Sequence, residues 1–482
     1  MNEMGSSVSS RRWWALGLIA AAQFMVIMDT SIIGVALPKM QAELGFSPGN
    51  LSWVFNAYVV AFGGLLLLGG RLSDLLGARR IFAAGWAVLL AGSLVAGLAT
   101  GVGTELAGRA IQGIGAALIA PAALTLLMML FGANPRELTK AIALYGAAAP
   151  AGGTAGVFLG GVITEYLSWP WVFFLNLPIA LVALVATPAL MPSSVVRRGS
   201  VDLLGALTVT VGLGAGVYAI VRAPEVGWSA GSTLLVGTAA VVLLGVFVAV
   251  QAKRREPLMR LGIFAAPNLA AANVAQLLLG AAWVPMWFFL NLYLQQVLGL
   301  SAFPSGAALL PMTTFIMLGM IVVAPRLIAA AGPKKTLVGG MAVLTVGLAG
   351  LSLIRSDGSF WADVLPASLI AAAGMSLAFI PSLGIALSSA RPEEGGLASG
   401  IVNTSYQIGS ALGLAAMTAV AAANGADLLG DPAALTDGYS AVFIGVAVIA
   451  AVGAVLAAIS LRMPGAPAQP DPASSVDVPT SR

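Results

Sequence analysis

The chain has 482 residues, of which 59% are hydrophobic and only 9% are charged, with a formal net charge of +4. Soluble domains carry about 25% charged residues, so this composition excludes a soluble globular protein and indicates an all-α polytopic membrane protein. The chain contains no cysteine and no histidine, which leaves proton chemistry to its carboxylates and offers no thiolate metal site.

Apolar runs of about twenty residues recur along the chain and predict fourteen membrane-spanning helices. Arg11 and Arg12 precede the first run, and its full spanning length favours a cytoplasmic anchor over a twin-arginine export signal. The expected spans are residues 13–37, 51–70, 80–100, 103–130, 139–163, 171–191, 201–221, 232–251, 268–290, 305–324, 336–354, 362–387, 398–421 and 438–461.

The distribution of lysine and arginine predicts the orientation of these spans. The loops expected outside hold only three basic residues, Lys39, Arg222 and Arg355, whereas the loops of the other side are strongly basic. Basic loops face the cytoplasm, so both termini are expected there. The Pro/Ser-rich tail predicts disorder. The loops expected inside hold Arg71, Arg79, Arg80, Arg136, Lys140, Arg197, Arg198, Lys253, Arg254, Arg255, Arg260, Arg326, Lys334, Lys335, Arg391 and Arg462.

A weak internal repeat indicates two homologous halves. Residues 70–81 (GRLSDLLGARRI) and 325–336 (PRLIAAAGPKKT) align in register, in the loops after the second and tenth spans. We therefore expect two six-helix bundles with a pair of helices inserted between them. The expected divisions are a cytoplasmic segment 1–12, a first bundle 13–191, a linker with two extra spans 192–262, a second bundle 263–462 and a disordered cytoplasmic tail 463–482.

Two opposite charges are expected deep in the membrane, Asp29 in the first span and Arg109 in the fourth. Buried charges in lipid are costly and mark ion or substrate pathways by default. From the expected span ends, Asp29 lies ~13 Å and Arg109 ~10 Å below the outer surface, so the two can meet. Protonation of Asp29 would then release Arg109, which is how a proton could be coupled to a conformational change.

Two other interpretations of this pair stay open. The pair could be permanent and serve only to lock helix packing. Alternatively, Glu105 lies four residues before Arg109 on the same helical face and could pair with it. Gln112, three residues after Arg109, could extend the polar network.

The loop after the second span is the most specific short motif. Its basic and acidic residues can pair with each other or with helix ends, a glycine permits a tight turn, and two arginines can anchor the third span. We expect this switch motif to act in a conformational change, and an ordinary anchored loop is the alternative. The residues concerned are Gly70, Arg71, Asp74, Gly77, Arg79 and Arg80.

Glycines recur every four residues in the fifth span, at Gly152, Gly156 and the pair Gly160 and Gly161. Such a stripe of small residues lets another helix approach closely. Polar and aromatic residues scattered over other spans could line a substrate cavity. These candidates are Gln23, Asn56, Tyr58, Tyr145, Asn176, Gln276, Trp283, Asn403, Tyr406 and Gln407.

Several of these stretches resemble those of the major facilitator superfamily, and in particular its fourteen-helix drug:proton antiporter group. Residues 29–38 (DTSIIGVALP) resemble the motif of the first helix, and residues 70–80 resemble the superfamily's loop motif. Arg109 with Gln112 and the glycine stripe resemble the motifs of the fourth and fifth helices, and residues 169–178 and 398–413 resemble two further stretches. Three positions depart from the pattern: Val157 replaces a proline, and Pro170 and Tyr406 replace arginines.

The resemblance implies a proton-coupled antiporter that exports amphipathic small molecules, such as drugs or antibiotics, across the cytoplasmic membrane. Its expected partners are a small-molecule substrate, protons and lipid, without nucleic acid or cofactor, and the protein is expected to be a monomer. The alternatives are an exporter of one metabolite, such as a siderophore, an amino acid or a self-made antibiotic, and a transport-inactive membrane sensor. No nucleophile–base pair or metal cluster points to an enzyme, and no phosphate-binding glycine loop points to transport driven by ATP.

Overall fold

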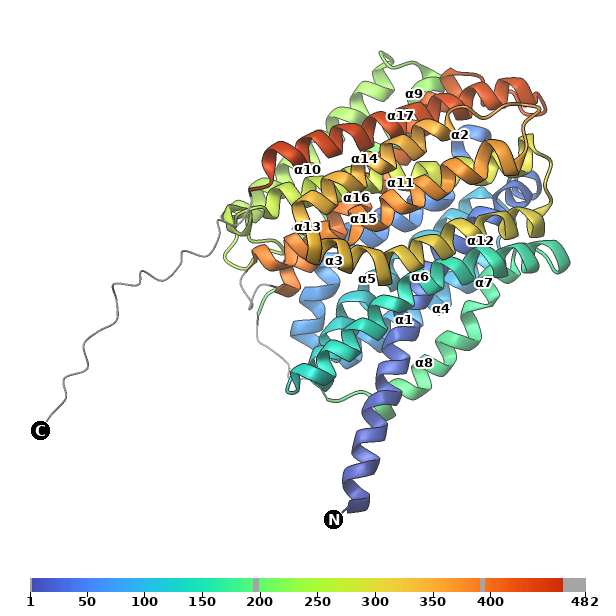
Figure 1. Ribbon diagram of the computed structural model, residues 1–482. Helices are drawn as coiled ribbons and strands as arrows, with labels where there is room; N and C mark the ends of the chain where they lie inside the picture. Colours follow the sequence, from blue (N-terminus) through green and yellow to red (C-terminus); the bar gives the residue numbers. More distant parts are fainter. Residues whose placement is uncertain (1, 194–198, 391–394, 463–482) are drawn as a thin grey trace, which may run out of the picture.

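The computed structural model describes residues 2–193, 199–390 and 395–462, which form a bundle of long helices lying side by side (Figure 1). Within these residues, fourteen helical segments are long and apolar enough to cross a membrane, as the sequence predicts. The expected tail, Arg197, Arg198 and Arg391 lie outside the described residues.

The first half of the chain supplies six spans. Their apolar residues form the buried contacts between neighbouring helices. Two of the connections between spans contain the short helices α2 and α7. The elements are α1 (Asn2–Leu44), α2 (Pro48–Leu51), α3 (Trp53–Leu76), α4 (Ala78–Gly97), α5 (Val102–Phe131), α6 (Pro135–Tyr166), α7 (Trp171–Phe174) and α8 (Asn176–Leu190).

Two further spans precede the second half, and three of the later helices contain π-helical stretches. The inserted pair is α9 (Leu203–Val226) and α10 (Gly231–Lys253). The second half comprises η1 (Leu261–Ala265), α11 (Leu269–Leu292), η2 (Tyr293–Val297), α12 (Ala302–Leu318), η3 (Gly319–Val323), α13 (Ala324–Ala331), α14 (Pro333–Leu351), η4 (Phe360–Val364), α15 (Leu365–Ser389), α16 (Gly395–Ala423) and α17 (Pro432–Ser460).

The two halves pack together mainly through α6 with α12 and α3 with α16, with further contacts of α1 on α11 and α12. The inserted helix α9 packs on both α3 and α16, so it covers one of these seams, whereas α10 packs mainly on α9. Within the first half, α1 packs on α6 and α5, and α5 also packs on α3 and α4. Asp29 and Arg109 therefore lie on neighbouring helices.

The first span is longer than predicted. It was expected to end near Pro38, but α1 continues through that proline to Leu44, and Lys39 there donates a hydrogen bond to the carbonyl of Thr164. Helix boundaries read from hydropathy stop where polar residues begin, although the helix itself can continue into the interface.

The expected loop after the second span is also mostly helical, because α3 includes Gly70, Arg71 and Asp74 and ends at Leu76. The turn itself is Gly77, whose φ of 93° is a conformation that residues with a side chain rarely adopt. In the second half Gly332 has a φ of 84° and likewise separates α13 from α14. The two aligned glycines thus make the same turn, which supports the internal repeat.

Candidate functional site

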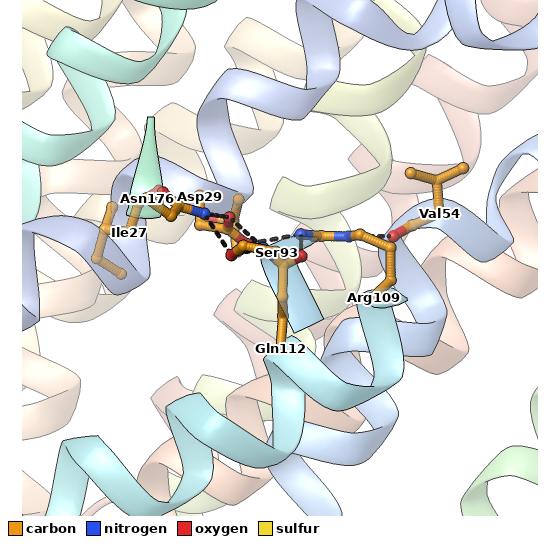
Figure 2. A network of polar contacts seen from close by, with 8 residues as sticks. Ile27, Asp29, Val54, Ser93, Arg109, Gln112 and Asn176 are labelled. Atoms are coloured by element: carbon orange, nitrogen blue, oxygen red, sulfur yellow. Dashed lines mark hydrogen bonds and ion pairs between the residues drawn. The ribbon is translucent and has the colours of Figure 1, made fainter. Parts of the chain in front are cut away.

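Asp29 of α1 and Arg109 of α5 form an ion pair in the interior of the first half. The distance from Arg109 Nη1 to Asp29 Oδ2 is 2.6 Å. Asp29 is 1% exposed and Arg109 is completely buried. Figure 2 shows the two side chains pointing toward one another from their separate helices. The structure thus brings together the two charges that the sequence predicts to meet.

Three polar side chains complete the surroundings of the Asp29 carboxylate. Gln112 accepts a hydrogen bond from Arg109 Nη1 at 2.7 Å and donates to Asp29 Oδ1 at 3.1 Å. Asn176, the first residue of α8, donates to the same oxygen at 2.8 Å. Ser93 of α4 accepts hydrogen bonds from both Gln112 and Asn176, at 2.8 and 3.1 Å. Asp29 therefore receives three donors, which suits an ionised carboxylate.

The Arg109 guanidinium is held from the other side by α3. Its Nε donates to the carbonyl of Val54 at 2.9 Å, and its central carbon lies 4.7 Å from the ring centroid of Tyr58. The Phe173 ring lies 5.9 Å away. A cation over an aromatic face is stabilised by the ring quadrupole. Of the residues expected to line a cavity, Asn176 thus binds Asp29, and Tyr58 contacts Arg109 through its ring.

Glu105 does not form the local ion pair with Arg109 that the sequence leaves open. It lies in the first turn of α5 and is completely buried, and neither carboxylate oxygen has a hydrogen-bond partner among the described residues. Arg109 Nη2 has no partner there either. The partner of Arg109 is Asp29.

The arginine of the switch motif pairs with the linker and not with Asp74. Arg71 Nη2 lies 2.8 Å from Glu256 Oε2, and its Nε donates to the Ser200 carbonyl at 3.2 Å. The Ser200 backbone amide and hydroxyl, followed by the Arg71 guanidinium, hold the pKa of the Glu256 carboxyl below its ordinary value. This cluster ties the end of α3 to both ends of the inserted helix pair.

The glycine stripe of α6 packs against two neighbouring helices, α1 and α12. A β-carbon at Gly152, Gly156 or Gly160 would overlap backbone atoms of α1, whereas one at Gly161 would meet α12. The β-carbon of an alanine at Gly156, for example, would lie 2.9 Å from the Met28 carbonyl oxygen. The stripe therefore sets how closely α1, which carries Asp29, approaches α6.

The remaining cavity candidates lie apart from this network. Tyr145 donates to Gln23 at 2.9 Å, which links α6 to α1. In the second half Gln276 donates to Ser382 at 2.9 Å, and the Tyr406 ring packs against Phe379. Further positions are Asn56, which is buried without a partner among the described residues, Trp283, which packs against the core, Asn403, which is exposed, and Gln407, which lies against Gly63.

A seam between the halves near the C-terminal end of α1 was not predicted from the sequence. Gln295 of η2 donates to the Val35 carbonyl at 3.0 Å, and Gln296 donates to Gln41 at 2.9 Å. Tyr439 of α17 donates to Gln296 at 2.6 Å. The adjacent Gln295–Gln296 pair at the end of an apolar run was the available signal. Ser93 and Glu256 were also missed, since a lone serine and a loop carboxylate look ordinary in a sequence.

The sequence profile of the Major Facilitator Superfamily matches residues 19–414. The chain belongs to this superfamily. It is 38% identical over 458 residues to the cephamycin export protein CmcT of Amycolatopsis lactamdurans, covering 94% of this chain and 93% of that protein. It is 37% identical to the puromycin resistance protein pur8 of Streptomyces alboniger, covering 89% and 86% of the two chains. The protein is thus a membrane transporter and not an enzyme.

Solved structures share the fold at low sequence identity. The nucleoside transporter NupG aligns with a TM-score of 0.63 and 14% identity, over 92% of this chain and 99% of that chain. A bacterial homologue of the drug peptide transporters PepT1 and PepT2 aligns with a TM-score of 0.63 and 19% identity, over 93% and 97%. These likenesses bear out the predicted major facilitator fold, and the fourteen apolar helices among the described residues match the predicted number of spans.

Proposed function

We propose that this transporter is a proton-coupled antiporter that exports amphipathic small molecules of the antibiotic class across the cytoplasmic membrane by alternating access. Two relatives, each matched over most of both chains, are named for export of cephamycin and for resistance to puromycin. These names each refer to one compound, which favours an exporter of a single antibiotic as the second candidate. An efflux panel separates the two, because a multidrug exporter confers resistance across several chemical classes.

The buried pair of Asp29 and Arg109 is the observation that carries the proposed coupling. When Asp29 is ionised, the two charges cancel and the hydrocarbon interior holds no net charge. When Asp29 takes a proton, it no longer serves as the counter-charge of Arg109, and the hydrogen bonds that join α1 to α5 weaken. Binding of one proton then biases the packing of α1, which is a differential interaction of the kind that alternating access requires.

The substrate path is proposed to lie between the halves, next to polar groups of both. Gln23 and Tyr145 supply such groups from the first half, and Gln276, Tyr406 and Gln407 from the second. Scattered polar groups on an apolar wall suit amphipathic molecules. The positive-inside distribution supports cytoplasmic termini, and the protein is proposed to act as a monomer.

Transport in proteoliposomes with an imposed pH gradient tests the coupling. We expect Asp29→Asn to abolish proton-driven export while substrate binding is partly retained, because the asparagine cannot exchange a proton. We expect Arg109→Ala to be at least as damaging, since it leaves a buried carboxylate without its counter-charge. Export by Asp29→Asn at the wild-type rate would remove Asp29 from the mechanism, and retained gradient dependence in Arg109→Ala would favour a pair that only locks packing.

A further inference from the structure

A second buried acid lies one helical turn from the ion pair. Glu105 and Arg109 are four residues apart on α5, so they share one face of the helix, and both are completely buried. Both oxygens of Glu105 and Nη2 of Arg109 lack a hydrogen-bond partner among the described residues. Glu105 thus has acceptors without a donor, and one helical turn further along α5 Arg109 has a donor without an acceptor.

The surroundings of the two acids assign them different protonation states. Asp29 faces Arg109 and two amide donors, which stabilise a carboxylate. Glu105 has no donor among the described residues, and a buried carboxylate without a donor is strongly unfavourable, which favours the proton on Glu105 over one on Asp29. The charged groups that interact electrostatically with Glu105 are Arg109 and Asp29. Tyr58 faces Arg109 from α3, and the residues of α4 from Trp86 to Gly97 include no ionisable side chain.

We infer that Glu105 is a second proton site and the alternative partner of Arg109, which changes partner from Asp29 to Glu105 when Asp29 is protonated. This inference rests on the proposed function, because it specifies how the proton reaches Asp29. It also explains why, among the described residues, one nitrogen of Arg109 has no partner although an acid lies one helical turn away.

The handover conserves charge and atoms. The O–H bond of Glu105 breaks, an O–H bond forms at Asp29, and the Glu105 carboxylate then accepts from Arg109 Nη2. Before and after the transfer, one of the two acids is protonated and the other is ionised. The net charge of Glu105, Asp29 and Arg109 together is therefore zero in both states, and no unpaired charge is created in the apolar interior. The Nε hydrogen bond to Val54 keeps the guanidinium in place while its two Nη groups serve the two acids in turn.

Infrared spectroscopy of the purified full-length protein in lipid nanodiscs tests the assignment directly. At pH 7 we expect the C=O stretch of a protonated carboxylic acid, and we expect Glu105→Gln to remove it. Asp29→Asn should remove the same band, because Arg109 then draws Glu105 into its ionised form. Glu225→Gln is the matched control, since Glu225 is exposed at the end of α9, and the band should persist in that variant. The absence of the band from the wild type, its survival in Glu105→Gln or its survival in Asp29→Asn would each overturn the inference.

Transport assays separate this inference from the proposed function. We expect Glu105→Gln to slow proton-driven export on the order of a hundredfold, as expected for loss of a proton-transfer group, while substrate binding persists. Wild-type export by Glu105→Gln together with loss of export by Asp29→Asn would refute the role of Glu105 alone. Wild-type export by both variants would refute the proposed coupling as well.

Discussion

Replacing Gly156 with alanine should force α1 away from α6 and disturb the Asp29–Arg109 pair. The new β-carbon would lie 2.8 Å from Ser31 Cβ, 2.9 Å from the Met28 carbonyl oxygen and 3.1 Å from the Ile32 amide nitrogen. Carbon atoms in contact prefer a separation of about 3.5–4.0 Å, so α1 must move by roughly 0.7 Å. Two of the three contacts are backbone atoms, and a side-chain rotation cannot relieve them.

The adjacent glycine provides the matched control. A β-carbon at Gly153 would lie 3.7 Å from the Ser31 hydroxyl and 3.8 Å from Ile27 Cγ2, which is ordinary contact. Both substitutions gain about the same helix propensity, up to ~1 kcal/mol. The difference in stability between Gly156→Ala and Gly153→Ala therefore measures the steric overlap with α1 alone. Overpacking costs about 1–3 kcal/mol. A change of about 1.4 kcal/mol shifts an equilibrium constant tenfold. Gly156→Ala should therefore reduce both the stability of the protein and its transport activity, whereas Gly153→Ala should leave both unchanged.

Thermal unfolding in detergent and proton-driven export in proteoliposomes measure the two effects. We expect a lower unfolding temperature and slower export for Gly156→Ala than for Gly153→Ala, at equal amounts of inserted protein. Equal stability and equal export in the two variants would refute the idea that the glycine stripe sets the position of α1.

Three further predictions concern other contacts. Gln112→Leu keeps the volume of the side chain but leaves its buried partners unsatisfied, at about 1–3 kcal/mol, and should weaken export by roughly tenfold in proteoliposomes. Cysteines at Gln41 and Gln296, joined by a short bifunctional thiol reagent, should hold the seam closed and stop export, since these side chains are in contact. Arg71→Glu should reduce export modestly, and the double variant with Glu256→Arg should restore it, because the two residues form an ion pair.

The controls for these predictions use features of the same chain. The sequence contains no cysteine, so single-cysteine variants treated with the same reagent reveal any effect of modification alone. For the exposed pair, the lowered pKa of Glu256 means that its contribution is complete above the ordinary carboxyl range and is lost only as the pH falls through the lowered value. Glu256→Gln should therefore leave the pH profile of export near neutrality unchanged, and a shifted profile would contradict this.

The sequence predicted the spans and the buried pair for physical reasons. Long apolar runs and the cost of charge in lipid leave few alternatives, so fourteen helices and the meeting of Asp29 with Arg109 could be expected. The internal repeat could be predicted from the aligned glycines Gly77 and Gly332, because each makes a turn with positive φ and such a turn favours glycine.

The partners of these groups could not be predicted, because they depend on helix rotation and register. Asn176 was expected in a cavity and lies against Asp29, and Arg71 pairs with Glu256 from the distant linker and not with nearby Asp74. Hydropathy reports which residues enter the membrane and not which face each helix presents to its neighbours. The same limit left Ser93 unnoticed within the apolar α4.

The position of α1 in the fold suggests how a change at Asp29 could reach the seam between the halves. The partners of Asp29 belong to α5 and α8 of the first half, whereas the later turns of α1 contact the second half, through Val35 with Gln295 and Gln41 with Gln296. Asp29 and Gln41 are separated by about 18 Å of helix. Loss of the ion pair would loosen α1 from α5, and the same rigid helix would then pull on its hydrogen bonds to η2. A change of charge at Asp29 therefore needs no intermediate element to reach the seam, since α1 contains both Asp29 and the residues that contact η2.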